Sequence, residues 1–204
     1  MELVITDHHQ IPDTLPRAQA IVNPHLQDGE LAFTDLAGVG VAFKLAAALY
    51  GDTDDILYQY ADLAAIGTIA DIMPLTDENR SIVKTGIRRI QDAPRPGIAA
   101  LLKAAGLSKK EIASSDIAFS VCPRINATGR MEHAAKAVEL LVCSDPQKAD
   151  FTAEQLNINN THRQEIEQEI YEDVIRQLSE EPALAKKRVI VVAGKGYHQG
   201  VVGI

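Results

Sequence analysis

The sequence has few cysteines and no long apolar run. Its two cysteines, Cys122 and Cys143, lack the spacing of metal-binding pairs and cannot make a disulfide framework. We therefore expect two small buried thiols in a reducing cytoplasm. No stretch approaches the roughly 20 apolar residues that a membrane span needs, and no cationic segment followed by an apolar one opens the chain. Nothing in this pattern favours a membrane partner or secretion.

Positive charge is also in short supply. Twenty Lys and Arg residues stand against 28 Asp and Glu residues, which gives a net charge of −8. This balance argues against a surface coated with nucleic-acid-binding charge, but it is compatible with a local basic groove and suits a site that collects cations. The 204 residues, 46% of them hydrophobic, are enough for one large globular domain, or for one domain and part of another.

The apolar pattern predicts an α/β protein with many helices. A strand is expected over residues 3–6, a short extended run over residues 20–24, and a buried strand over residues 188–193. Asp145 followed by Pro146 predicts the start of a helix of about 30 residues, about 45 Å long, which would connect two lobes. Residues 66–75 are expected to form a buried turn and residues 115–131 a shaped loop. Shorter helices are expected over residues 37–50 (a buried one), 56–66, 79–90, 97–105 and 133–142.

The first candidate site is Asp7-His8-His9, directly after the first predicted strand. Polar groups at the carboxyl end of a strand lie at the edge of the sheet where ligands collect in α/β proteins. Imidazole nitrogen and carboxylate oxygen together suit divalent transition metals. Asp71, within an apolar segment, is a second candidate ligand. The alternatives are a polar strand end without function and a capping or salt-bridging role for Asp71.

Two further clusters could bind phosphate. The segment PRINATGR contains Arg124, Asn126 and Arg130 among small residues, and the arginine fork matches phosphate oxygens. Surface ion pairs with the many acidic residues are the alternative. A glycine-rich turn with Gly196, His198 and Gly200 follows the last predicted strand, where backbone N–H groups could face a phosphate.

The segments VITDHH, VNPH, LAGVGVAFKLAAAL, GTIADIMPL, PRINATGR and GYHQGVVGI, in this order, resemble the single-strand-specific DNA exonucleases of the DHH phosphoesterase superfamily. The resemblance runs from about residue 3 to the last residue. It implies the C-terminal part of a DHH catalytic domain over residues 1–145 and a connector helix over 146–182. The start of a DHH-associated nucleic-acid-binding domain would occupy residues 183–204.

The resemblance also implies a hydrolase that degrades single-stranded DNA in the 5′→3′ direction during DNA repair and recombination, with two manganese or magnesium ions. The roles that it implies are metal ligation by His8 and Asp71, orientation of the catalytic site by Asp7, catalysis beside the scissile phosphate by His9, and binding of DNA phosphates by Arg124, Asn126, Arg130, Gly196, His198 and Gly200.

The chain departs from the family pattern at its start. The aspartate-rich first motif and a further ligand aspartate precede the triplet in the family, and neither is present here. We therefore expect a fragment of a longer protein, inactive by itself. Two other functions stay open: a phosphodiesterase for short oligonucleotides or cyclic dinucleotides, and a non-catalytic nucleic-acid-binding relative. Partner proteins, such as those of DNA repair, cannot be identified from the sequence.

Overall fold

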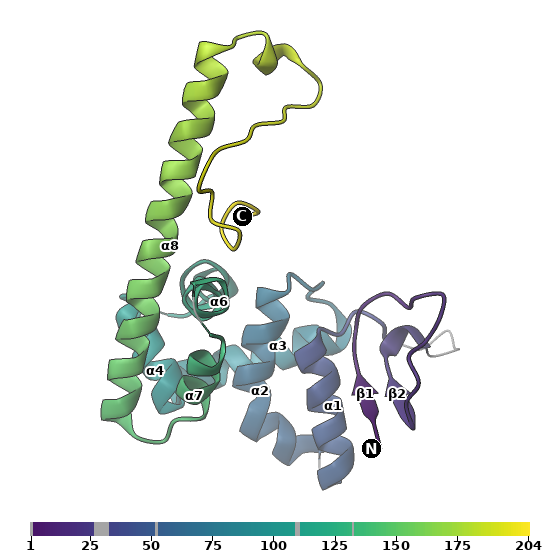
Figure 1. The fold of residues 1–204 in the computed structure, drawn as a ribbon. Coiled ribbons are helices and arrows are strands. Elements are labelled where there is room, and N and C mark those ends of the chain that lie inside the picture. Colours follow the sequence, from purple (N-terminus) through teal and green to yellow (C-terminus); the bar gives the residue numbers. More distant parts are fainter. Residues whose placement is uncertain (1, 27–32, 52, 109–110, 132) are drawn as a thin grey trace.

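The computed structural model describes residues 2–26, 33–51, 53–108, 111–131 and 133–204. Two short strands, β1 (Val4–Thr6) and β2 (Ala20–Val22), pair in parallel with Ile5 opposite Ile21. They lie at one edge of the molecule beside helix α1, as Figure 1 shows. Because the strands are parallel, the residues that follow each of them emerge at the same edge. The predicted strand and the predicted extended run are both confirmed. A 3₁₀ turn, η1 (Pro24–Leu26), follows β2.

Three helices form the centre of the molecule. They are α1 (Gly38–Tyr50), α2 (Thr53–Ala70) and α3 (Asp77–Asp92), close to the predicted ranges. Gly51 ends α1 with a positive φ of 70°, a conformation that glycine adopts without strain. Helices α2 and α3 approach so closely that a Cβ on Gly86 would come within 2.2 Å of the Ala61 carbonyl oxygen. The prediction that α1 is buried is wrong for one face, since Leu49 and Tyr50 are exposed.

The main apolar core extends from α2 and α3 to α4 (Pro96–Ala104), α7 (Ala135–Val142) and the long helix α8 (Pro146–Glu180). Ile98, Leu101, Leu140 and Leu156 are almost completely buried in it. Asp145 caps α8, because its carboxylate accepts hydrogen bonds from the N–H groups of Gln147 and Lys148. The predicted long helix is thus confirmed. Its 35 residues span about 52 Å, and its second half stands clear of the other helices in Figure 1.

The loop predicted over residues 115–131 is a helix. A short turn, α5 (Ser114–Asp116), continues into a π-helical segment, η2 (Ile117–Val121), and then into α6 (Cys122–Met131). Pro123 suggested a loop because it has no N–H group to donate and crowds the preceding turn. The wider π turn, in which Cys122 N–H bonds to the Ile117 carbonyl, accommodates it. Burial of Ile117, Val121 and Ala127 holds this helix against the core.

Two other predictions of local structure are wrong. Helix α2 extends to Ala70, so the turn after it is short, and Ile72 there is 90% exposed rather than buried. Residues 188–193 form no strand, and Val191 is 78% exposed. A strand requires a hydrogen-bonding neighbour, and the described residues supply none beside this segment, which follows the 3₁₀ turn η3 (Leu184–Lys186).

The helices of the described residues include none with the length and apolar character of a bilayer crossing. Both cysteines are free, as predicted. Cys122 is buried, and this burial raises the pKa of its thiol to about 11. Cys143 is only partly buried.

Candidate metal and nucleic-acid site

The Asp7-His8-His9 triplet leaves the carboxyl end of β1 and is held there by backbone pairing. Asp7 N–H donates to the Val22 carbonyl at 3.0 Å, which extends the pairing of β1 with β2. The Asp7 carboxylate then lies 2.7 Å from Nδ1 of His9. This hydrogen bond is the largest reason that the pKa of Asp7 lies below its usual value. A carboxylate at Nδ1 fixes the tautomer and leaves Nε2 of the exposed His9 ring for a ligand.

His8 and Asp71 meet although they are far apart in the sequence. Asp71 follows the last residue of α2, and its Oδ2 lies 3.5 Å from Nε2 of His8. The His8 ring packs against the start of α1, where a Cβ on Gly38 would come within 3.2 Å of the ring. Glycine at this position therefore gives the ring the space to face Asp71.

This pair fits a divalent cation. The donors are an imidazole nitrogen and a carboxylate oxygen, the combination that manganese accepts. Two ligands of one ion at about 2.1 Å each lie no more than about 4.2 Å apart, and the observed 3.5 Å is within that limit. Within the described residues, no set of three or more His, Cys, Asp or Glu side chains has the geometry to hold an ion. His8 and Asp71 therefore supply two donors of an incomplete ligand set.

Asn23 is a residue of this site that sequence reasoning missed. It follows β2 and is 95% shielded from solvent, with 5% of its surface exposed. Its Nδ2 donates to the His9 carbonyl at 2.9 Å, and its Oδ1 accepts from His25 N–H at 2.9 Å. The side chain thus ties the backbone of the triplet to the end of the neighbouring strand. The available signal was a polar residue near the end of the predicted extended run, at the same sheet edge.

The structure separates the arginines of PRINATGR. Arg124 points toward α8, where its Nε donates to Asn157 Oδ1 at 3.0 Å, and its Nη1 donates to the Ser120 carbonyl at 2.6 Å. Burial is the main reason that its pKa lies below the usual value. Arg130 lies on another face of the same helix, and its Nη1 donates to the Gly200 carbonyl at 2.9 Å. The two predicted phosphate ligands therefore have different environments.

Asn126 and Arg130 line a groove of about 420 Å³ between α6 and α8, called here the α6–α8 groove. Arg163 of α8 faces it and pairs with Glu167 at 2.5 Å. Asn126 also lines a second, apolar hollow of about 350 Å³, together with Gly67 and Ala70 near the end of α2. Asn126 therefore lies between the groove and the hollow at the end of α2, the helix that Asp71 follows. Its complete lining is Phe119, Pro123, Asn126, Arg130, Arg163, Gln164, Glu167 and Ile204.

The predicted glycine-rich turn contacts Arg130, which lines the α6–α8 groove. Gly196 has a positive φ of 83°, and a Cβ on Gly200 would come within 2.7 Å of the Arg130 carbonyl oxygen. His198 Nδ1 accepts from Gly200 N–H at 3.1 Å, so this histidine stabilises the turn itself. The structure thus brings the PRINATGR segment and the glycine-rich turn together, through the contact of Arg130 with Gly200.

Tyr197 of this turn is anchored to α8, a contact that the sequence did not indicate. Its hydroxyl donates to Asp173 Oδ2 at 2.6 Å, and Gln177 Nε2 donates to the same carboxylate at 2.8 Å. The Tyr197 bond is the largest cause of the lowered pKa of Asp173, and it raises the pKa of Tyr197 in turn. The C-terminal segment therefore folds back along α8 (Figure 1).

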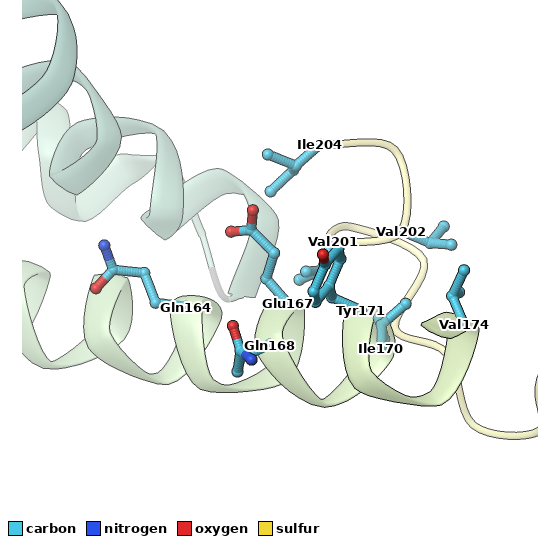
Figure 2. A pocket seen from close by; sticks show the side chains of 9 residues that line it. All are labelled: Gln164, Glu167, Gln168, Ile170, Tyr171, Val174, Val201, Val202 and Ile204. Atoms are coloured by element: carbon cyan, nitrogen blue, oxygen red, sulfur yellow. The ribbon is translucent and has the colours of Figure 1, made fainter. Parts of the chain in front are cut away.

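A larger hollow of about 570 Å³ lies between α8 and this segment. Figure 2 shows the side chains of α8, among them Glu167 and Tyr171, facing Val201 and Ile204. Its lining contains one carboxylate and, among the described residues, no cation. This chemistry is poorly suited to a phosphate, in contrast to the neighbouring α6–α8 groove.

The chain is similar to one protein family and to several named exonucleases. The family described as "DHH family, N-terminal domain" matches residues 1–68. The single-stranded-DNA-specific exonuclease RecJ of Bacillus subtilis strain 168 is 41% identical over 100% of this chain and 25% of its own length. RecJ of Escherichia coli K12 is 39% identical over 99% of this chain and 38% of its own length.

Solved structures agree with this similarity. RecJ of Thermus thermophilus in complex with Mn²⁺ superposes with a TM-score of 0.83 at 36% identity, over 99% of this chain and 30% of that one. An exonuclease RecJ bound to manganese gives a TM-score of 0.84 at 34% identity, over 99% of this chain and 50% of that one. The chain thus spans half or less of the length of each of these relatives.

Proposed function

We propose that this chain, which belongs to the DHH family, forms part of a metal-dependent exonuclease that hydrolyses single-stranded DNA in the 5′→3′ direction. The enzyme would act in the cytoplasm, in DNA repair and recombination. The observation that carries the proposal is the meeting of His8 and Asp71, whose donor atoms lie 3.5 Å apart although a strand and two helices separate them in sequence.

His8 and Asp71 would hold manganese or magnesium, the ions present in the similar RecJ structures. Further ligands would have to come from residues outside the described set, in keeping with two ions in a complete site. Such ions, when bound, lower the pKa of a coordinated water and neutralise charge on a phosphate. This chemistry requires no nucleophilic side chain from the protein.

The remaining residues would orient the strand and handle protons. Asp7 holds the His9 ring through Nδ1, so Nε2 can exchange a proton or a hydrogen bond with the substrate phosphate. Arg130 and Asn126 would bind phosphates along the α6–α8 groove, and the turn with Gly196, His198 and Gly200 would continue this track. In this proposal Arg124 acts mainly by fixing α6 to α8.

The test separates chemistry from binding in the full-length gene product. His8→Ala and Asp71→Asn should each lower the rate of strand hydrolysis in manganese by at least about 100-fold, because loss of one ligand weakens the metal site. Affinity for single-stranded DNA, measured in calcium, should change less than about threefold, since the phosphate track lies elsewhere. His133→Ala and Asp92→Asn, changes of exposed side chains of the same types, serve as matched controls.

Equal loss of rate and affinity in His8→Ala, or a normal rate, would contradict its assignment as a metal ligand. Strand length distinguishes the competing functions. Faster turnover of dinucleotides or cyclic dinucleotides than of long single strands would favour a phosphodiesterase for short substrates. Tight strand binding without hydrolysis in the full-length protein would indicate a non-catalytic relative.

A further inference from the structure

Phe119 is a large apolar side chain on the surface of a groove that is also lined by charged and amide side chains. It lies in the π-helical segment η2, and 82% of its surface is exposed. Phenylalanine is usually buried, as Phe43 is in this chain. Phe119 lines the α6–α8 groove together with the candidate phosphate ligands. The hydrophobic core therefore does not explain its presence there.

Helical spacing places Phe119 on the same face as those ligands. Phe119, Pro123, Asn126 and Arg130 follow one another at intervals of four, three and four residues, the spacing of a single helix face. Arg124 is off this face and bonds to α8. One face thus presents an aromatic ring, an amide and a guanidinium in a row along the groove.

The other wall of the groove indicates the chemistry of its occupant. Glu167 pairs with Arg163, so the negative charge of Glu167 is offset and the guanidinium of Arg130 remains as the excess charge. A partner helix of another protein would need a wider apolar surface than the side chains of Phe119, Pro123 and Ile204 provide. A strand with flat bases and a negative backbone matches both features.

We propose that Phe119 is a base-stacking platform that binds one nucleobase of single-stranded DNA, while Arg130 binds a phosphate of the same strand. This inference rests on the proposed function and adds a residue to it. Stacking on a phenylalanine does not distinguish the four bases, because every base has a π-face. Phe119 therefore contributes affinity without sequence preference.

The test uses the chain itself, whose lack of tryptophan allows a direct signal. Phe119→Trp introduces a single indole, and its fluorescence should be quenched by a strand of about 12 thymidine nucleotides, within the range of known single-strand sites. An abasic strand of equal length and charge should not quench it. Phe151→Trp is the matched control, because Phe151 is 70% exposed on α8 but is not part of the groove.

Affinity gives the second measurement. Phe119→Leu should weaken binding of the thymidine strand by roughly 5- to 100-fold and leave binding of the abasic strand unchanged, because only stacking is lost. Phe151→Leu should change neither affinity. If Phe119→Leu binds like wild type while Arg130→Ala binds weakly, the stacking role is wrong and the proposed function stands. If wild type binds neither strand, the stacking role and the phosphate track are both wrong.

Discussion

Arg124 and Arg130 show how far the role of a residue depends on its surroundings. Both lie in one short motif and on one helix. Arg124 donates to Asn157 and to a backbone carbonyl, whereas Arg130 faces the groove and the glycine-rich turn. Arginine thus links two helices at position 124, and at position 130 it faces the groove that we propose binds phosphate.

We predict that Arg124→Ala lowers the free energy of unfolding by about 1–3 kcal/mol, because it removes one charge-assisted hydrogen bond to Asn157 of α8 and one to the Ser120 carbonyl. Arg130→Ala should change this free energy by less than about 0.5 kcal/mol, as expected for an exposed side chain. It should weaken single-strand affinity by about tenfold or more. Urea denaturation and strand titration measure the two effects. Equal losses of stability in both variants would contradict this division.

Ion pairing joins the central helices at a buried carboxylate. Asp62 of α2 is fully buried, and its Oδ2 lies 2.9 Å from Arg95 Nε, just before α4, and 3.4 Å from Arg89 Nε of α3. Arg95 also donates to the Gln59 carbonyl. The Asp62 side chain therefore connects α2, α3 and the start of α4, and it is the anionic partner of both Arg89 and Arg95.

Asp62→Ala should lower the free energy of unfolding by about 3–5 kcal/mol, because it leaves partly buried arginines without their counter-charge. Thermal and urea denaturation measure this loss. Asp92→Ala, at the exposed end of α3, should shift the same quantity by no more than about 0.5 kcal/mol. A small effect of Asp62→Ala would mean that the arginines find water or other partners.

Across the whole molecule, two contacts hold the C-terminal segment against the helices. Tyr197 and Asp173 fasten this segment to α8, and Arg130 and Gly200 fasten it to α6. The lowered pKa of Asp173 adds stability above the ordinary aspartate pKa of about 4, which is lost as the pH falls through the lowered value. The raised pKa of Tyr197 adds stability below about pH 10, which is lost as the pH rises through the raised value.

We therefore expect the segment to keep both contributions between about pH 4 and pH 10. In a spectrophotometric titration of the five tyrosines, Tyr197 should ionise at a higher pH than the others. Asp173→Asn should return the pKa of Tyr197 to the ordinary tyrosine range, because the carboxylate that opposes its ionisation is gone. Tyr50→Phe, which removes an exposed tyrosine, should leave the late step in place. A late step that survives Asp173→Asn would contradict the assignment.

Local sequence determined much of this protein without reference to tertiary contacts. Apolar periodicity predicted most helices, Asp145 and Pro146 marked the start of α8, and Gly51 marked the end of α1. These signals act within one helical turn, so the sequence alone suffices to recognise them. The triplet Asp7-His8-His9 was also recognisable, because its residue types and its place after a strand carry the chemistry. The roles of the site residues and the domain limits at residues 145 and 182 stay predictions.

Only the tertiary structure decided which side chains meet and which segments keep their expected form. It brought His8 to Asp71, placed Asn23 beneath His9, and divided Arg124 from Arg130. Packing against the core made a helix of residues 114–131 despite Pro123. Residues 188–193 have no neighbouring strand among the described residues and form no regular element. The physical reason is the same in each case: contacts between residues distant in sequence outweigh local preferences of about 1 kcal/mol per residue.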